Sequence, residues 1–175
     1  MITLITAMDE DRLIGRRDVL PWNLPEEMEH FRRTTLGSVV IFGRATWESM
    51  ASDPPYLDGR INFVVTRKPS DWQAKLADAG FDPTYGPHFV DTIELAVTRA
   101  KRDFPEYVEN IFLLGGRQIY ELALRKNLVT RMLISHVKGK HIGDVYFPQF
   151  GPEWTGKTIS TCETFDVVEY TKGSS

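Results

Sequence analysis

Apolar and polar positions along this chain fall into blocks that have the lengths of strands and helices. Continuous apolar and β-branched runs predict strands that are buried on both faces, at residues 2–8, 38–43, 61–66 and 111–116. Helical periodicity predicts helices at residues 25–35, 44–50, 70–79, 91–103 and 118–125. Further strand patterns follow at residues 88–90, 131–138, 144–147, 157–162 and 165–172. The last two are expected to form an antiparallel hairpin.

The order of these elements predicts an α/β fold. Strands that alternate with helices and are followed by strands alone indicate a mostly parallel central sheet, with helices on both faces and an antiparallel C-terminal edge. We expect residues 1–172 to form a single domain and residues 173–175 to form a loose tail. Ligands of parallel sheets bind at the carboxyl ends of the strands, and residues 9–24 are expected to form a loop that covers such a site.

Local sequence also predicts where two of the helices begin. Ser70 with Gln73 resembles a capping box, and Asp91 with Glu94 resembles another. The first pair predicts a helix that extends to Ala79, and the second predicts the helix at residues 91–103.

Composition restricts the classes of partner. The chain has 175 residues and a formal net charge of -3, which gives no overall attraction for nucleic acid or an acidic membrane. We therefore predict neither partner, and an anionic ligand must be met by local positive charge. The apolar run at residues 2–8 is too short to span a bilayer. The single cysteine, Cys162, excludes an internal disulfide and favours the reducing cytoplasm, and no metal site is expected.

The helix predicted at residues 25–35 places a carboxylate among apolar residues. Pro25 suits the first position of a helix, so Glu27 falls in the first turn. Helical spacing puts Glu27 on the same stripe as Met28 and Phe31. Two interpretations are open. In the first, Glu27 interacts only with the helix dipole. In the second, the stripe faces a ligand cleft, where burial raises the pKa of Glu27 and makes it a proton donor near neutral pH.

Two strands end in glycine and lead directly into helices. The strand at residues 38–43 ends at Gly43, and the strand at residues 111–116 ends in a pair of glycines. Such turns leave free backbone N–H groups at the carboxyl edge of the sheet, where a phosphate can bind. Arg44 and Thr46 would complete the first of these sites. The alternative is an ordinary strand-to-helix turn with a solvated arginine.

Six motifs, in this order and at these spacings, resemble those of the dihydrofolate reductase family. They are LIG at 13–15, LPWNLPEE at 20–27, GRATWES at 43–49, GRINFVVT at 59–66, LGGRQIY at 114–120 and GDVYFP at 143–148. The resemblance extends along the whole chain. It implies that this chain is an NADPH-dependent oxidoreductase. Such an enzyme reduces 7,8-dihydrofolate to 5,6,7,8-tetrahydrofolate by hydride transfer and supports one-carbon and thymidylate metabolism.

The resemblance also implies roles for four catalytic residues. Glu27 would bind the pterin edge through its carboxylate and assist protonation of a ring nitrogen, through an ordered water that Trp22 helps to hold. Tyr120 would flank the nicotinamide and stabilise the positive charge that develops there. Leu20 would lie in the loop that closes over the nicotinamide. Bacterial relatives usually carry Asp at the position of Glu27, which with Met28 suggests reduced sensitivity to diaminopyrimidine antifolates.

The same resemblance implies the residues that bind the two ligands. For dihydrofolate they are Ile5, Ala7, Glu27, Met28, Phe31, Met50, Leu57, Arg60, Leu114 and Ser135. For NADPH they are Ala7, Ile14, Gly15, Leu20, Gly43, Arg44, Thr46, Thr66, Arg67, Gly115, Gly116, Gln118, Ile119 and Tyr120. Arg60 would pair with the α-carboxylate of the glutamate tail, and Ser135 would steady the acid. Arg44 and Arg67 together favour NADPH over NADH.

Some residues depart from the family pattern, and two other functions remain open. Arg117 stands where relatives often have a third glycine, and residues 72–88 form a longer segment than in compact bacterial relatives. One alternative function is a pyrimidine reductase of riboflavin synthesis, which would lack the acid-bearing helix. The other is a non-catalytic folate or nucleotide binder, against which Glu27, Trp22 and Tyr120 argue together. The expected ligands also include antifolate inhibitors, and the chain is expected to be a monomer.

Overall fold

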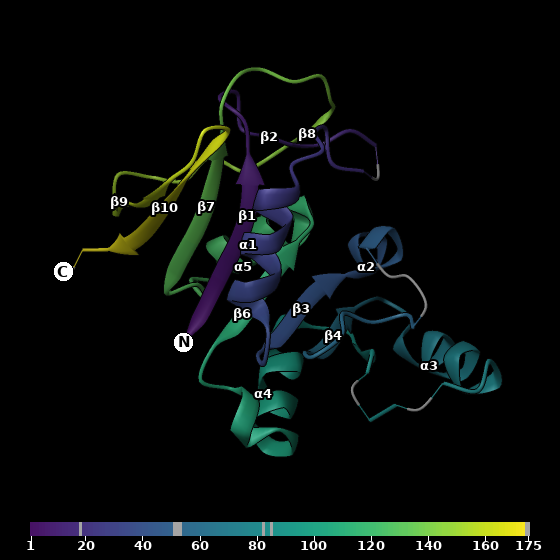
Figure 1. Ribbon diagram of the computed structural model, residues 1–175. Coiled ribbons are helices and arrows are strands. Elements are labelled where there is room, and N and C mark those ends of the chain that lie inside the picture. The colour runs from purple at the N-terminus through teal and green to yellow at the C-terminus, as the bar shows by residue number, and fades with distance from the viewer. Residues whose placement is uncertain (18, 51–53, 82, 85, 174–175) are drawn as a thin grey trace.

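The fold is known from a computed structural model that describes residues 1–17, 19–50, 54–81, 83–84 and 86–173. The main strands are β1 (Ile2–Met8), β3 (Val39–Gly43), β4 (Ile61–Val65), β5 (His88–Val90), β6 (Ile111–Gly115), β7 (Arg131–Val137), β9 (Trp154–Thr161) and β10 (Phe165–Lys172). They form an eight-stranded sheet in the order β5-β4-β3-β6-β1-β7-β10-β9 (Figure 1).

Strand direction in this sheet follows the sequence prediction. Strands β5, β4, β3, β6, β1 and β7 pair in parallel. Strand β10 pairs antiparallel with both β7 and β9, which makes the C-terminal edge antiparallel. The predicted α/β class, its mostly parallel sheet and its antiparallel hairpin are therefore confirmed.

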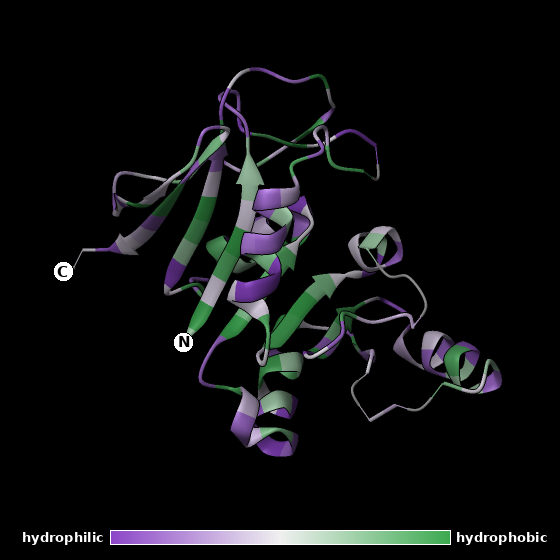
Figure 2. Cartoon of the chain, in the orientation of Figure 1, coloured by the Kyte–Doolittle hydropathy of each residue, from purple (hydrophilic) through white to green (hydrophobic). Residues whose placement is uncertain are grey.

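Helices cover both faces of the sheet. The helices are α1 (Pro25–Thr35), α2 (Arg44–Met50), α3 (Pro69–Asp78), α4 (Ile93–Asp103) and α5 (Arg117–Arg125), with a 3₁₀ turn, η1, at Pro105–Tyr107. Alternate residues of β3 belong to two separate cores, because Val39 and Ile41 pack with α4 and α5, whereas Val40 and Phe42 pack with α1, α2 and α3. Figure 2 shows the apolar residues concentrated in the central strands and the polar ones on the outer side of α1.

Three details of the elements differ from the sequence prediction. Ser70 does not cap α3, because Pro69 already occupies the first turn and Lys68 stands at the N-cap without a side-chain hydrogen bond. Helix α4 is capped by Thr92 rather than Asp91, and the Thr92 hydroxyl accepts a hydrogen bond from the Leu95 N–H at 3.1 Å. The segment expected to be an uninterrupted covering loop contains β2 (Leu13–Gly15), paired antiparallel with β8 (Val145–Tyr146).

The expected C-terminal tail falls only partly within the described residues. Residues 174 and 175 of the expected tail lie outside them, and the division into one domain and a tail stays a prediction. None of the described helices has both the length and the apolar character needed to cross a membrane.

A buried amide on β4 organises the turn that precedes it. Asn62 is fully buried, and its Oδ1 accepts a hydrogen bond from the Leu57 N–H at 2.8 Å. Its Nδ2 donates to the carbonyl oxygens of Leu57 and Arg60, both at 2.9 Å. The side chain therefore satisfies three backbone groups of the turn, of which the Arg60 carbonyl is buried and the two groups of Leu57 are partly buried.

We predict that Asn62→Ala lowers the free energy of unfolding by about 1–3 kcal/mol, because it leaves those backbone groups unpaired. Urea unfolding followed by far-ultraviolet circular dichroism measures the change. Gln73→Ala, at an exposed position on α3, serves as the control and should change stability by less than about 0.5 kcal/mol. Equal effects of the two substitutions would contradict the role of Asn62.

Candidate active site

A cleft of about 1910 Å³ opens at the carboxyl ends of the parallel strands. Its walls come from the ends of β1, β3, β4 and β6, from α1 and from the covering loop. These elements are far apart in the sequence and are brought together by the strand order of the sheet (Figure 1). The cleft therefore lies where parallel sheets place their ligands.

Glu27 lies on the wall of this cleft as a buried acid. It is 6% exposed, whereas Glu26 beside it is exposed. Burial raises the pKa of Glu27 above its ordinary value, and a hydrogen bond with Ser135 of β7 opposes that rise. No described cation lies within 4.0 Å of the Glu27 carboxyl. A glutamate that only interacted with the helix dipole would have no need of burial, so the geometry favours the ligand-cleft interpretation.

Trp22 and Tyr120 bring two different polar groups to the same region. The indole Nε1 of Trp22 is buried and has no hydrogen-bond partner among the described residues, so its N–H is available to a ligand or a water in the cleft. The Tyr120 hydroxyl donates to the Ile5 carbonyl oxygen at 2.9 Å. Burial of Tyr120 raises the pKa of its hydroxyl, and the charge of Glu27 acts in the same direction. A side-chain hydrogen bond with Thr6 opposes this rise, and Tyr120 is a neutral hydroxyl.

Arg60 is a buried cation at another part of the cleft. It is 6% exposed, its Nε donates to the Asp58 carbonyl oxygen at 2.9 Å, and its Nη1 donates to the Thr35 hydroxyl at 3.1 Å. Burial lowers the pKa of Arg60, and the nearby Asp58 charge opposes this. Within the described part of the chain, no carboxylate lies within 4.0 Å of it. A buried guanidinium with unused donors fits an anionic ligand group.

Two glycine turns form a close-packed cradle at the ends of β3 and β6. A Cβ atom on Gly116 would lie 3.0 Å from the Thr46 hydroxyl oxygen, and one on Gly43 would lie 3.2 Å from Ile119 Cγ1. Only glycine fits these contacts without displacing a neighbour. Gly116 is the N-cap of α5 and offers no side-chain cap, so the first N–H groups of this helix are open to a phosphate.

The side chain of Arg117, which stands where relatives often have a third glycine, is held by two contacts. The Arg117 guanidinium pairs with Glu121 at 2.9 Å and donates to the Tyr146 carbonyl oxygen at 3.1 Å. Both partners hold the side chain along α5 and toward β8, and Arg117 also lines the cleft.

Positive charge gathers near the end of β4, at one end of the cleft. Arg44, Arg67 and Lys68 line this end, and Thr66 accepts a hydrogen bond from the Lys68 N–H at 3.3 Å. These residues supply the local positive charge that the chain as a whole lacks. The glycine cradle and the cationic end together suit a ligand that carries phosphate groups.

The covering loop is held over the cleft by two contacts to residue 144. The Asp144 carboxylate accepts a hydrogen bond from the Arg17 N–H at 2.7 Å, and the Asp144 N–H donates to the Gly15 carbonyl oxygen at 3.1 Å. Leu20, farther along this loop, is 46% exposed and lines the cleft.

Most residues expected from the sequence line this one cleft. The expected side chains that line it are Ile5, Ala7, Ile14, Leu20, Trp22, Glu27, Met28, Phe31, Arg44, Thr46, Met50, Leu57, Arg60, Thr66, Arg67, Leu114, Gln118, Ile119 and Tyr120, with the glycines Gly15, Gly43 and Gly116. Two expected residues do not line it: Ser135 contributes through Glu27, and Gly115 packs against the Tyr120 ring.

Sequence reasoning missed Trp72 and Lys68 as cleft residues. The sequence pattern predicts only a helix at Trp72, although this residue follows the turn at residues 66–68 by one helical turn. That spacing is the signal that places it at the cationic end. No group of three or more metal-ligating side chains occurs among the described residues.

Comparisons with known proteins agree with this geometry. A model of the family "Dihydrofolate reductase" matches residues 1–169. The chain is 32% identical over 160 residues to dihydrofolate reductase HdrB of Haloferax volcanii, covering 90% of this chain and 74% of that protein. It is 33% identical over 161 residues to the dihydrofolate reductase of Mycobacterium tuberculosis, covering 90% and 86%.

A solved structure is similar to this chain along almost its whole length. It is the dihydrofolate reductase from Enterococcus faecalis, complexed with NADP(H) and RAB-propyl. The TM-score is 0.78 at 21% identity, and the match covers 99% of this chain and 97% of the other. At that identity the likeness supports the fold. With the family match and the relatives above, it follows that this chain belongs to the dihydrofolate reductase family and is an NADPH-dependent oxidoreductase.

Proposed function

We propose that this chain reduces 7,8-dihydrofolate to tetrahydrofolate by a hydride transfer in which Glu27 controls the proton. The observation that carries the proposal is the burial of Glu27 in the cleft, which raises the pKa of its carboxyl at a place where no described cation lies within 4.0 Å. NADPH supplies the hydride when it is bound. The acid-bearing helix α1 argues against the pyrimidine reductase alternative.

Glu27 serves both binding and protonation. Its carboxylate is a suitable acceptor for paired N–H donors on the edge of a pterin, and its low-dielectric surroundings strengthen such bonds. The unpartnered N–H of Trp22 can hold a water beside the acid, so that the proton reaches the ring nitrogen through that water. Ser135 holds the carboxyl from the side of β7.

Tyr120 stabilises the charge that develops on the cofactor side of the cleft. Because its hydroxyl hydrogen is directed to the Ile5 carbonyl oxygen, the negative end of the hydroxyl dipole can face a developing positive charge. Leu20 and the rest of the covering loop exclude water from this region when the loop is closed.

The remaining residues position the two ligands. Arg60 is proposed to pair with the α-carboxylate of the glutamate tail. The apolar wall holds the pterin and benzoyl rings, and it consists of Ile5, Ala7, Met28, Phe31, Met50, Leu57 and Leu114. The glycine cradle with Thr46, Gln118 and Ile119 is proposed to hold the pyrophosphate, while Arg44, Thr66 and Arg67 hold the 2′-phosphate.

The oligomeric state and the compartment of this chain are part of the proposal. We propose that the chain acts as a monomer, because one chain supplies an acid, a tail-binding cation and a phosphate cradle to the same cleft. A single cysteine supports a reducing cytoplasmic setting.

We predict that Glu27→Gln lowers the rate of the hydride step by about 10²–10⁴ at neutral pH, because the acid is lost. In the parent the protonated form exists below the raised pKa, so the rate falls as pH rises through that pKa; in the variant this dependence disappears. Single-turnover NADPH oxidation across pH measures both effects. Glu26→Gln, on the same helix but exposed and not lining the cleft, is the control. A variant as fast as its parent would exclude Glu27 as the acid.

We predict that Arg60→Leu raises the KM for dihydrofolate by at least about tenfold and leaves the KM for NADPH within about twofold, since a buried charge-assisted pair is lost. Initial-rate kinetics measure both constants. A dihydropterin without a glutamate tail provides the matched substrate control, and its KM should not change. An equal rise in KM for the substrates with and without a glutamate tail would contradict a role of Arg60 in binding that tail.

We predict that diaminopyrimidine antifolates bind this chain less tightly than they bind relatives with Asp at this position, and that Glu27→Asp lowers the inhibition constant by about tenfold. The longer side chain shifts the oxygen pair by one methylene, which misplaces the charge-assisted hydrogen bonds to the inhibitor. Competitive inhibition kinetics on parent and variant test this. An unchanged inhibition constant in the variant would contradict the role given to the extra methylene.

A further inference from the structure

Trp72 of α3 presents an aromatic ring at the cationic end of the cleft. The ring lines the cleft and is fixed from its other sides by aromatic neighbours. It stacks on Phe89 at a centroid distance of 6.2 Å and an interplanar angle of 24°, and the Trp47 ring meets it edge-on at 5.5 Å. Because these neighbours restrict its rotation, the Trp72 ring is a fixed platform.

Two cations lie against this platform. The Arg44 guanidinium carbon is 5.8 Å from the centre of the Trp72 ring, and the Lys75 Nζ is 4.4 Å from it. Both distances are in the range of cation–π attraction. The one described hydrogen-bond partner of the Arg44 side chain is Glu48, at 2.6 Å. A guanidinium has five N–H donors, so Arg44 retains donors for a ligand.

The charges at this end of the cleft suit a phosphate monoester. Arg44, Arg67 and Lys68 are the cations that line it, and Asp91 is an acid on the same wall. Glu48 is engaged by Arg44. Gly43 of β3 pairs with Val65 of β4, so Arg44 starts α2 beside the turn at residues 66–68, and the Trp72 ring limits the positions that its guanidinium can adopt.

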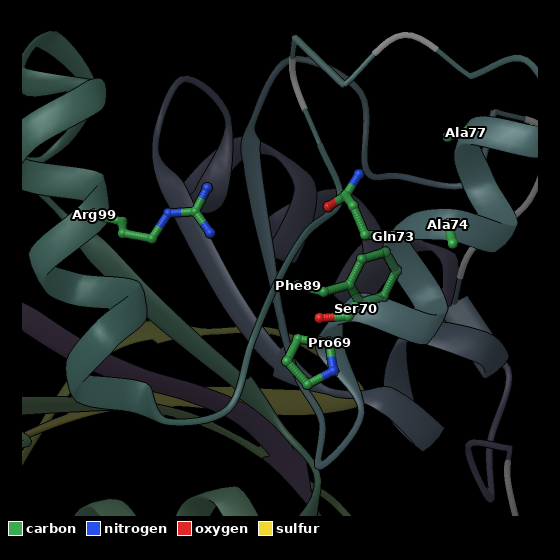
Figure 3. Close-up of a pocket in the computed structure, with 7 residues that line it drawn as sticks. All are labelled: Pro69, Ser70, Gln73, Ala74, Ala77, Phe89 and Arg99. Atoms are coloured by element: carbon green, nitrogen blue, oxygen red, sulfur yellow. The ribbon is translucent and has the colours of Figure 1, made fainter.

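The opposite side of α3 offers no comparable arrangement. There, a shallow hollow of about 590 Å³ is lined by Pro69, Ser70, Gln73, Ala74, Ala77, Phe89 and Arg99. Figure 3 shows Arg99 reaching into this hollow from α4 and Gln73 facing it from α3. Arg99 is directed to the Phe63 ring at 5.7 Å and to Asp103 at 3.9 Å, so it is already used within the fold.

We propose that Trp72 is a positioning residue for cofactor recognition, which holds Arg44 in place for the 2′-phosphate of NADPH and so sets the preference for NADPH over NADH. This inference rests on the proposed cofactor site and adds to it a residue of α3. Trp72 acts through Arg44, and the cation–π contact lowers the cost of ordering that side chain when the phosphate binds.

The test is calorimetric titration of the Trp72→Leu variant with NADPH and with NADH. We expect the dissociation constant for NADPH to rise about 5- to 20-fold, as expected for loss of a cation–π contact, and that for NADH to change less than about twofold. Trp72→Phe keeps an aromatic face and should recover part of the NADPH affinity. In an Arg44→Leu background, Trp72→Leu should have no further effect on NADPH binding, because Trp72 acts through Arg44.

Trp154→Leu is the matched control, since Trp154 also carries a cation on its ring, Lys172 Nζ at 5.0 Å, but lies on β9. It should leave both cofactor affinities unchanged. Equal weakening of NADPH and NADH by Trp72→Leu, or no weakening of either, would overturn the proposal. So would an undiminished effect in the Arg44→Leu background. Because binding is measured without dihydrofolate, loss of turnover would count against the proposed function and not against this inference.

Discussion

The desolvation of the Glu27 carboxyl is the constraint on which the rest of the site depends. The first turn of a helix favours a charged carboxylate, whereas burial among apolar groups favours the neutral acid. In this chain burial dominates, because the pKa is raised in spite of the hydrogen bond from Ser135. Because no described cation lies within 4.0 Å of it, this carboxyl is stabilised either by binding a proton or by accepting hydrogen bonds from the N–H groups of a ligand. A pterin provides such donors and also needs the proton.

The sheet makes this arrangement possible by bringing distant residues to one edge. The parallel register pairs Ala7 of β1 with Ser135 of β7, which places the hydroxyl beneath α1. The same edge carries the glycine turns after β3 and β6, where Gly43 and Gly116 let two helices begin in close contact. Asn62 shapes the turn that carries Arg60. The acid, the tail-binding cation and the phosphate cradle are thus placed by one set of backbone contacts.

Much of this fold could be predicted from the sequence, because the long strands and amphipathic helices are encoded by local periodicity. The helix starts were less predictable: a proline at the first turn moved the start of α3 ahead of Ser70, and Thr92 capped α4 in place of Asp91. Strand β2 is only three residues long, and it exists through pairing with β8, a contact that no local pattern encodes.

The candidate site was predictable where a motif fixes a residue to a turn or a helix face, as at Glu27 and Gly43. It was not predictable where the role comes from packing between elements. The spacing puts Trp72 one helical turn after the turn at residues 66–68, but only the tertiary structure brings its ring beside Arg44. The burial of Arg60 is similar, since an arginine at the start of a strand is usually solvated.

The most direct test of the account is a site-specific titration of the Glu27 carboxyl, by ¹³C nuclear magnetic resonance of glutamate-labelled protein, with Glu27→Gln used to assign the signal. The account predicts that this carboxyl titrates above the value of about 4.3 that is ordinary for glutamate, and above Glu29, whose pKa is lowered by its hydrogen bond with Arg32. A Glu27 carboxyl that titrates at or below the ordinary value would contradict the account, because it would then be a carboxylate with no proton to give.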